Sequence, residues 1–281
     1  MPERIYTLRP IRPNKGIEMA YRKKLIKLID EMQHSVKYWI ESEYKRQEPV
    51  IMADDATPAD AMARALRKRF TQWQRNFRRE ARKLAEWFAR SNYRYVDNAF
   101  KDSIRSYRSE KFQQKLNEVG FTIDLKMTPA VENVLKSFIH ANVNYIHSIP
   151  QQYFTDVEGM VMRAVRSGRD LEYLSGELEK YYTTKGKDRA VRLARDQTNK
   201  ATSQLAIARQ RELGITHAIW KHAGGVKSPR HSHEAADGKI FSLKDGLIIP
   251  GEAGYGGKVG IFPGEAINCH CYARPIIKEF M

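Results

Sequence analysis

Residues 262–275 read FPGEAINCHCYARP, and this stretch holds both cysteines of a chain of 281 residues. The two thiols, Cys269 and Cys271, are separated only by His270. A disulfide between them would be strained, because a relaxed bridge needs a specific Cα separation and dihedral angle. Two cysteines also cannot form a disulfide framework. We therefore expect reduced thiols in a reducing compartment.

Glycine is concentrated around the start of this stretch. Ten of the 17 glycines lie in the 41 positions from Gly224 to Gly264, a density that predicts loops and short strands. Just before them, residues 215–225 (ITHAIWKHAGG) alternate apolar and polar side chains, as a β-strand does. The C-terminal part is therefore predicted to be a small glycine-rich α+β domain.

The first 214 residues have a different pattern, which predicts long helices. Apolar side chains recur there mainly at three- and four-residue steps. Pro150 is expected to end one helix. Asp170 is expected to cap the start of another, and Gly214 to close the last.

The chain is predicted to be an α+β protein with three parts. Residues 1–15 carry three prolines without periodicity and are expected to form an extended arm. Residues 16–164 form a basic, mostly helical region with long helices. Residues 165–281 form the smaller C-terminal domain.

The composition points to an acidic partner. The chain has 49 Lys and Arg against 33 Asp and Glu, a net charge of +16. Such an excess indicates nucleic acid or an acidic protein surface. The N-terminus has no apolar leader and no stretch approaches about 20 apolar residues, so we expect neither a secretory signal nor a membrane span.

The positive charge is densest between Arg64 and Lys115, where 16 Lys or Arg stand against 5 Asp or Glu. These residues fit either an ordinary solvated helix face or a surface that contacts DNA or an acidic partner, and charge alone does not decide between the two. The aromatic residues here have core spacing and are not interpreted as base-stacking platforms. The candidate contacts with DNA or an acidic partner are Arg67, Lys68, Arg75, Arg78, Arg79, Arg82 and Lys83.

Reactive side chains gather in residues 228–241 (SPRHSHEAADGKIF) and in the cysteine stretch. Thiolate and imidazole are the ligands that zinc prefers, and four of them would close a tetrahedral site. The candidate zinc ligands are His231, His233, Cys269 and Cys271, since alternate residues of a strand face one side. The alternative is that the cysteines are small buried residues in a tight packing unit.

An enzymatic alternative uses some of the same residues. In a metal-dependent nuclease His233 would activate water and Asp237 would bind the metal. The sequence has no second carboxylate cluster for two-metal chemistry. Residues 251–260 (GEAGYGGKVG) lack the GK[ST] ending of a phosphate-binding loop. We predict that the protein is not an enzyme, with a zinc-dependent nucleic-acid-processing enzyme and a plain DNA-binding protein as the alternatives.

Four motifs in order resemble a known family. They are ARDQTNKATSQLAIARQRELGI (194–215), THAIWKHAG (216–224), RHSHEAADGKIF (230–241) and PGEAINCHCYARP (263–275). This order is similar to the C-terminal domain of the phage Mu F-like head morphogenesis proteins, the minor head proteins of tailed bacteriophages. The resemblance covers roughly residues 165–277, under half of the chain.

The resemblance is carried by particular residues, with two departures. The matching positions are Ala194, Arg195, Trp220, Arg230, His233, Asp237, Gly238, Pro263, Gly264, Asn268, Cys269 and Cys271. The family usually has Thr-Glu after the helix arginine, where this chain reads Asp196-Gln197, and Arg between the cysteines, where it has His270. Several relatives carry an earlier CxxC that would complete a zinc site with the last cysteine pair. This chain has only two cysteines, so only His231, His233 or His270 could substitute.

What the resemblance implies is a structural role. Members resemble minor capsid components that associate with the portal protein, other capsid proteins and the scaffold during procapsid assembly. The expected location is the virion, inside the capsid at the portal vertex, after assembly in the host cytoplasm. Packaged double-stranded DNA is a further expected partner and no membrane is involved.

The family residues are interpreted as a structural clasp. The thiols and His233 would hold the glycine-rich terminal segment against the helix that contains Arg195. Asn268 would hydrogen-bond local backbone, as asparagine does at turns. Zinc is the one cofactor that these side chains suggest.

Overall fold

The computed structural model describes residues 6–52, 57–107, 110, 114, 127–224, 230–252 and 259–277. The chain forms two compact units, each built from separate stretches. Unit 1 comprises residues 1–18, 88–138 and 195–281, and unit 2 comprises residues 19–87 and 139–194. These unit boundaries differ from the domain divisions expected after residues 15 and 164. The expected divisions stay predictions.

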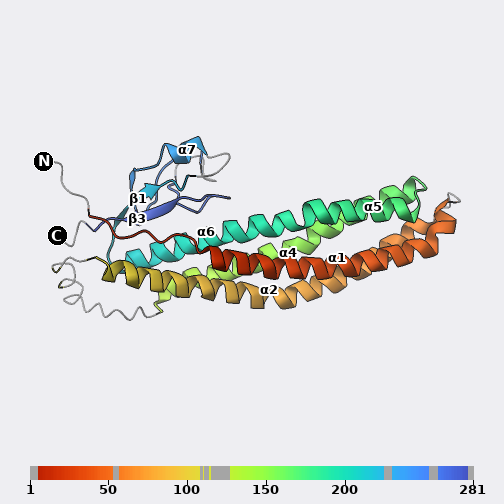
Figure 1. The fold of residues 1–281 in the computed structure, drawn as a ribbon, viewed down its shortest axis with the longest axis horizontal. Helices are drawn as coiled ribbons and strands as arrows, with labels where there is room; N and C mark the ends of the chain where they lie inside the picture. The colour runs from red at the N-terminus through yellow and green to blue at the C-terminus, as the bar shows by residue number, and fades with distance from the viewer. Residues whose placement is uncertain are drawn as a thin grey trace. The chain divides into compact units, whose positions relative to one another are not determined.

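The elements follow the expected order of long helices and then a small sheet (Figure 1). The helices are α1 (Lys15–Met52), α2 (Thr57–Arg105), α4 (Pro129–Arg166), α5 (Leu171–Tyr181), the π-helical η1 (Tyr182–Gly186), α6 (Lys187–Glu212) and α7 (His231–Glu234). The strands are β1 (His217–Lys221), β2 (Ile240–Ser242) and β3 (Tyr272–Pro275). The predicted α+β class is confirmed. Among the described residues, none of the helices combines the length and apolar character needed to cross a membrane.

One predicted helix end is wrong, because α4 continues through Pro150. A proline inside a helix loses a hydrogen bond and clashes with the preceding turn, at a cost of about 3 kcal/mol. The apolar face of α4 nevertheless continues on both sides, since Ile146, Ile149 and Tyr153 are all at least 96% buried. Each such burial contributes roughly 1.5–3 kcal/mol, so packing outweighs the local defect.

The other predicted helix boundaries are confirmed. Asp170 has extended backbone and its Oδ1 accepts a 2.9 Å hydrogen bond from the Tyr173 amide, which starts α5. Gly214, two residues after the end of α6, has a positive φ of 74°, and its amide donates to the Arg211 carbonyl at 2.9 Å. Between these two boundaries, α5 continues into α6 through the π-helical turn η1.

The sheet belongs to unit 1 and has the antiparallel order β2-β1-β3. Central strand β1 pairs through Ile219 with Ile240 on one side and Arg274 on the other. Alternation along β1 directs Ala218 and Trp220 into the core, where both are fully buried. The sheet thus rests on a core that includes residues of α2, α4 and α6 in the same unit.

The described part of the N-terminal arm, residues 6–14, precedes α1 and extends the pairing beyond β3. Thr7 forms a β-bridge with Ile276, and the Leu8 amide donates to the Pro275 carbonyl at 3.1 Å. Leu8 and Ile11 are buried in the core of unit 1. The arm therefore holds the end of the cysteine-bearing segment in place.

Candidate functional site

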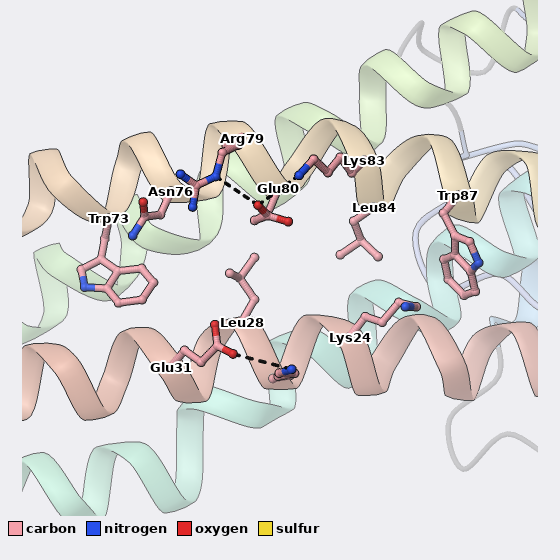
Figure 2. A pocket seen from close by; sticks show the side chains of 11 residues that line it. Lys24, Leu28, Glu31, Trp73, Asn76, Arg79, Glu80, Lys83, Leu84 and Trp87 are labelled. Carbon is pink, nitrogen blue, oxygen red and sulfur yellow. Dashed lines mark hydrogen bonds and ion pairs between the residues drawn. The ribbon is translucent and has the colours of Figure 1, made fainter.

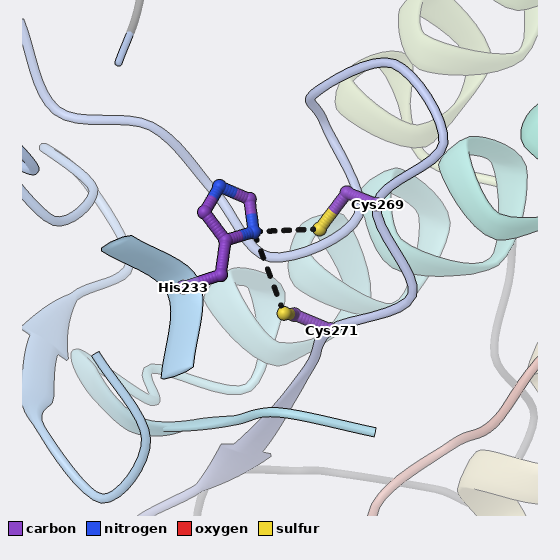
Figure 3. A group of neighbouring side chains, drawn as sticks. All are labelled: His233, Cys269 and Cys271. Atoms are coloured by element: carbon purple, nitrogen blue, oxygen red, sulfur yellow. Dashed lines mark hydrogen bonds between the residues drawn. The ribbon is translucent and has the colours of Figure 1, made fainter. Parts of the chain in front are cut away.

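His233, Cys269 and Cys271 form a compact buried cluster in unit 1 (Figure 3). The Nδ1 atom of His233 lies 3.3 Å from the sulfur of Cys269 and 3.6 Å from that of Cys271. The three possible ligand atoms all lie within 4.8 Å of one another. Each side chain belongs to a residue that is at most 5% exposed.

The short helix α7 decides which histidine enters this cluster. Residues two apart on a helix point about 200° apart, because each residue turns the chain by about 100°. His233 therefore points inward, whereas the His231 side chain is 98% exposed, with its Nδ1 3.1 Å from Glu234. The HxH pattern predicts a strand in which both rings face one side. The structure instead brings His233 to the thiols and leaves His231 away from them.

The far side of the His233 ring faces a carboxylate. Its Nε2 atom is buried, forms no hydrogen bond to the described residues, and lies 3.6 Å from Oε1 of Glu252. Glu252 is held by the Ser232 hydroxyl, which donates to it at 2.8 Å, and by Arg230, whose Nη1 is 3.5 Å away. The His233 ring therefore directs Nδ1 at the two sulfurs and Nε2 at the carboxylate of Glu252.

The pKa values of the two thiols shift in opposite directions. The hydrogen bond from Cys271 lowers the pKa of Cys269 to about 4, against the effect of burial. The Gly264 amide, 3.3 Å away, also donates to the Cys269 sulfur. The same bond with Cys269, together with burial, raises the pKa of Cys271 far above its usual range. The surroundings therefore favour deprotonation of Cys269 over that of Cys271.

The segment that carries the cysteines is attached to α6 by polar contacts. Asp196 Oδ1 accepts a 2.7 Å hydrogen bond from the Asn268 amide, and Asn199 Nδ2 donates to the Cys269 carbonyl at 3.0 Å. Asn268 has a positive φ of 58°, a conformation that asparagine tolerates better than most residues. Its backbone conformation and amide, rather than its side chain, make the observed anchor.

A second attachment uses a glycine. The Ser203 hydroxyl donates to the Pro263 carbonyl, next to Gly264, whose φ is 81°. A Cβ atom on Gly264 would lie 2.9 Å from the Ser203 Cβ and 3.3 Å from the Asn199 carbonyl oxygen. Only glycine therefore lets this turn approach α6 so closely.

Trp220 of β1 supports the cluster, together with Asp237 and Gly238 from the turn between α7 and β2. The Trp220 ring packs edge-on against His233 with centroids 5.4 Å apart. Gly238, with a φ of 82°, donates its amide to the Trp220 carbonyl at 2.9 Å. Asp237 accepts 2.8 Å hydrogen bonds from Lys221 Nζ and the His222 amide, and these outweigh burial and lower the pKa of the Asp237 carboxyl.

Two arginines complete the set of family residues. Arg230 joins α7 to the cysteine segment, since its Nη2 donates to the Ile267 carbonyl at 3.1 Å. Arg195 is not one of the three cluster residues, and its charge acts on His270 instead. Burial and the Arg195 charge lower the pKa of His270.

Four residues that help to hold this site together were not identified from the sequence. Asp196, Asn199 and Ser203 lie at positions i, i+3 and i+7 of α6, so one helix face makes all the contacts. That spacing of polar residues is visible in the motif of residues 194–215. Glu252 follows no local pattern, because it reaches His233 through the tertiary fold.

A second candidate surface lies on α2, within unit 2. The seven cations predicted there are all exposed. At 100° per residue they fall within about 160° of the helix circumference, along roughly 24 Å of the axis. Three of them pair with acids: Arg79 and Lys83 with Glu80, and Arg82 with Glu86.

Next to this stripe, α1 and α2 enclose a groove of about 510 Å³ (Figure 2). Lys24, Lys27, Arg79 and Lys83 line it together with two tryptophans. The Lys24 ammonium lies 5.0 Å from the ring centroid of Trp87. The basic character of α2 thus continues into the groove.

Comparison with known proteins bears on the segment that contains the clasp. Residues 155–274 match the family model described as Phage Mu protein F like protein. This segment is similar to the Mu F-like family. The match confirms the resemblance found in the four sequence motifs. The Mu F-like segment ends within β3 and includes all the clasp residues named above.

One relative is similar over most of the chain. A Haemophilus influenzae protein described as an uncharacterized protein is 26% identical over 277 residues. The alignment covers 96% of this chain and 55% of the relative, so the chain spans about half the length of that relative. No solved structure matches the chain.

Proposed function

We propose that this protein is a minor capsid protein that acts in the head morphogenesis of a tailed phage. The observation that carries the proposal is the Mu F-like match over residues 155–274, which contains the clasp. The proposed partners are the portal protein and other capsid and scaffold proteins. The proposed location is the capsid interior at the portal vertex, after assembly in the host cytoplasm.

In this proposal the C-terminal cluster is structural. His233, Cys269 and Cys271 are at most 5% exposed, which leaves little access for a substrate. Their contacts instead join α7, the cysteine segment and α6. A zinc-dependent nuclease, the competing proposal, predicts DNA cleavage that stops in His233→Ala and persists in His231→Ala. Metal-dependent cleavage with that dependence would overturn the structural role.

The head-assembly test is incorporation into particles. Heads assembled with and without the chain should differ in assembly yield or DNA retention, and tagged chain should co-sediment with procapsids. Asp196→Ala removes the acceptor of the Asn268 amide and should reduce incorporation. Glu132→Ala removes an exposed acid on α4 and should leave it unchanged. Normal heads with no chain in them would contradict the proposal.

We also propose that the basic stripe of α2 contacts packaged DNA. The support is its one-sided arrangement, because a stripe of exposed cations matches the regular negative charge of a duplex. The alternative partner is an acidic protein surface. DNA contact predicts sequence-independent binding that weakens steeply as salt rises.

The test compares two variants that each lose four positive charges. The stripe variant changes four exposed cations to Gln: Arg67, Lys68, Arg75 and Arg78. The control changes four exposed cations elsewhere: Lys136, Arg163, Arg166 and Lys180. The slope of log K against log salt should become shallower by about 0.9 for each phosphate that the stripe variant no longer neutralises, and the control should keep the wild-type slope. Equal slopes in the two variants would contradict DNA contact by α2.

A further inference from the structure

We infer that His233, Cys269 and Cys271 bind one zinc ion, with Glu252 as the acceptor behind the histidine. This inference goes beyond the proposed head-assembly role and does not depend on it. It starts from three soft ligand atoms that converge in a buried place. Thiolate sulfur and imidazole nitrogen are the ligands typical of structural zinc.

The distances between ligand atoms fit a tetrahedral ion. With zinc bonds of about 2.3 Å to sulfur and 2.0–2.1 Å to nitrogen, the edge between sulfur and nitrogen is roughly 3.6 Å. The observed Sγ–Nδ1 distances are 3.3 Å for Cys269 and 3.6 Å for Cys271. Both sulfur–nitrogen edges therefore suit one ion closely, and the third edge, between the two sulfurs, is no longer than 4.8 Å.

Hydrogen bonding alone satisfies this cluster poorly. Nδ1 of His233 has one hydrogen-bonding direction in the ring plane, whether it donates or accepts, so it cannot form a full hydrogen bond with both sulfurs. A metal ion would bind Nδ1 and both sulfurs at once. Zinc binding would displace the thiol protons to solvent, because thiolates are the ligands of zinc.

The surroundings match those of a metal-bound histidine. Such a ring usually donates its other N–H to a carboxylate, which fixes the tautomer and the ring orientation. With Nδ1 on the metal, Nε2 of His233 carries the proton and faces Glu252 Oε1 at 3.6 Å. Ser232 and Arg230 hold that carboxylate in place. The Gly264 amide, which donates to the Cys269 sulfur, would further stabilise a bound thiolate.

The described residues offer three ligands. A fourth ligand, water or another group, would complete the tetrahedron. The ion would join α7 to the cysteine segment, which Asp196 and Asn199 attach to α6. Zinc would thus lock the clasp at the point where three segments of unit 1 meet.

The first test is metal content and spectroscopy of the full chain. Protein expressed with zinc and purified under reducing conditions should contain about one zinc per chain by elemental analysis. After removal of zinc, Co²⁺ should restore a sulfur-to-cobalt charge-transfer band with an intensity that corresponds to two thiolates. Folded wild-type protein that binds well under one equivalent, or cobalt without thiolate bands, would overturn the inference.

Matched variants assign the ligands. His233→Ala, Cys269→Ser and Cys271→Ser should lose the metal, whereas His231→Ala should keep it, because His231 is exposed. Equal loss in both histidine variants would overturn the assignment.

A second pair of variants, which leaves the proposed ligands unchanged, keeps the test valid if the ligand variants fail to fold. Glu252→Gln should weaken zinc affinity about 10–100-fold, as removal of such an acceptor typically does. Glu234→Gln, which changes the exposed partner of His231, should leave the affinity unchanged. Unchanged zinc affinity in Glu252→Gln would contradict the role assigned to this carboxylate.

Discussion

Replacing Gly264 by alanine should destabilise unit 1 through two separate effects. The first is conformational, since Gly264 has a φ of 81° and a side chain in that region costs about 1–2 kcal/mol. The second is steric. The new Cβ would lie 2.9 Å from the Ser203 Cβ and 3.3 Å from the Asn199 carbonyl oxygen, too close for either to remain in place.

The chain supplies a control that isolates the steric effect. Gly238 has a φ of 82°, and a Cβ there meets nothing within 4 Å. Gly238→Ala should therefore cost only the conformational part, about 1–2 kcal/mol. Forced overpacking adds typically 1–3 kcal/mol, so Gly264→Ala should cost roughly 2–5 kcal/mol in total. The loss of flexibility in the unfolded chain affects both variants alike.

The assay is urea unfolding of both variants and the wild type, followed by circular dichroism. The free energy of unfolding should fall more in Gly264→Ala than in Gly238→Ala, by about 1–3 kcal/mol. Equal losses in the two variants would refute the reasoning, because they would mean that the turn at Gly264 does not press on α6.

Three further changes probe other parts of the fold and the clasp. Arg209→Met should lower the free energy of unfolding in urea by about 3–5 kcal/mol. The reason is that Arg209 contacts both carboxylate oxygens of the largely buried Asp97, at 2.7 and 2.9 Å. A loss below about 1 kcal/mol, the range of solvated surface pairs, would show that this pair is solvated. Asp170→Ala removes the N-cap of α5 and should lower stability by about 1 kcal/mol in the same assay. Changing Cys269 and Cys271 together to Ser should lower the melting temperature, and unchanged melting would contradict the clasp.

The sequence was most informative where local chemistry decides the structure. Asp170 and Gly214 mark helix ends because a side-chain acceptor and a positive φ are needed at those positions. The strand alternation around Trp220 likewise predicted the burial of that side chain correctly. The four ordered motifs indicated the family segment, which the match over residues 155–274 confirms.

Prediction was weaker where packing outweighs local preference. Pro150 lies inside α4 because buried side chains on both sides favour one continuous helix. The side chains of His231 and His233 point in different directions because their segment forms a helical turn. The HxH pattern in the sequence does not indicate that turn. Glu252 reaches His233 only in the folded chain, so no spacing rule finds it.

The proposed role requires association with the portal vertex, and co-purification tests this association most directly. The chain would be expressed with the portal protein of the same phage and analysed by size-exclusion chromatography with light scattering at moderate salt. The proposed role predicts a defined complex of fixed stoichiometry. A folded, monomeric chain that elutes apart from the portal protein would contradict it.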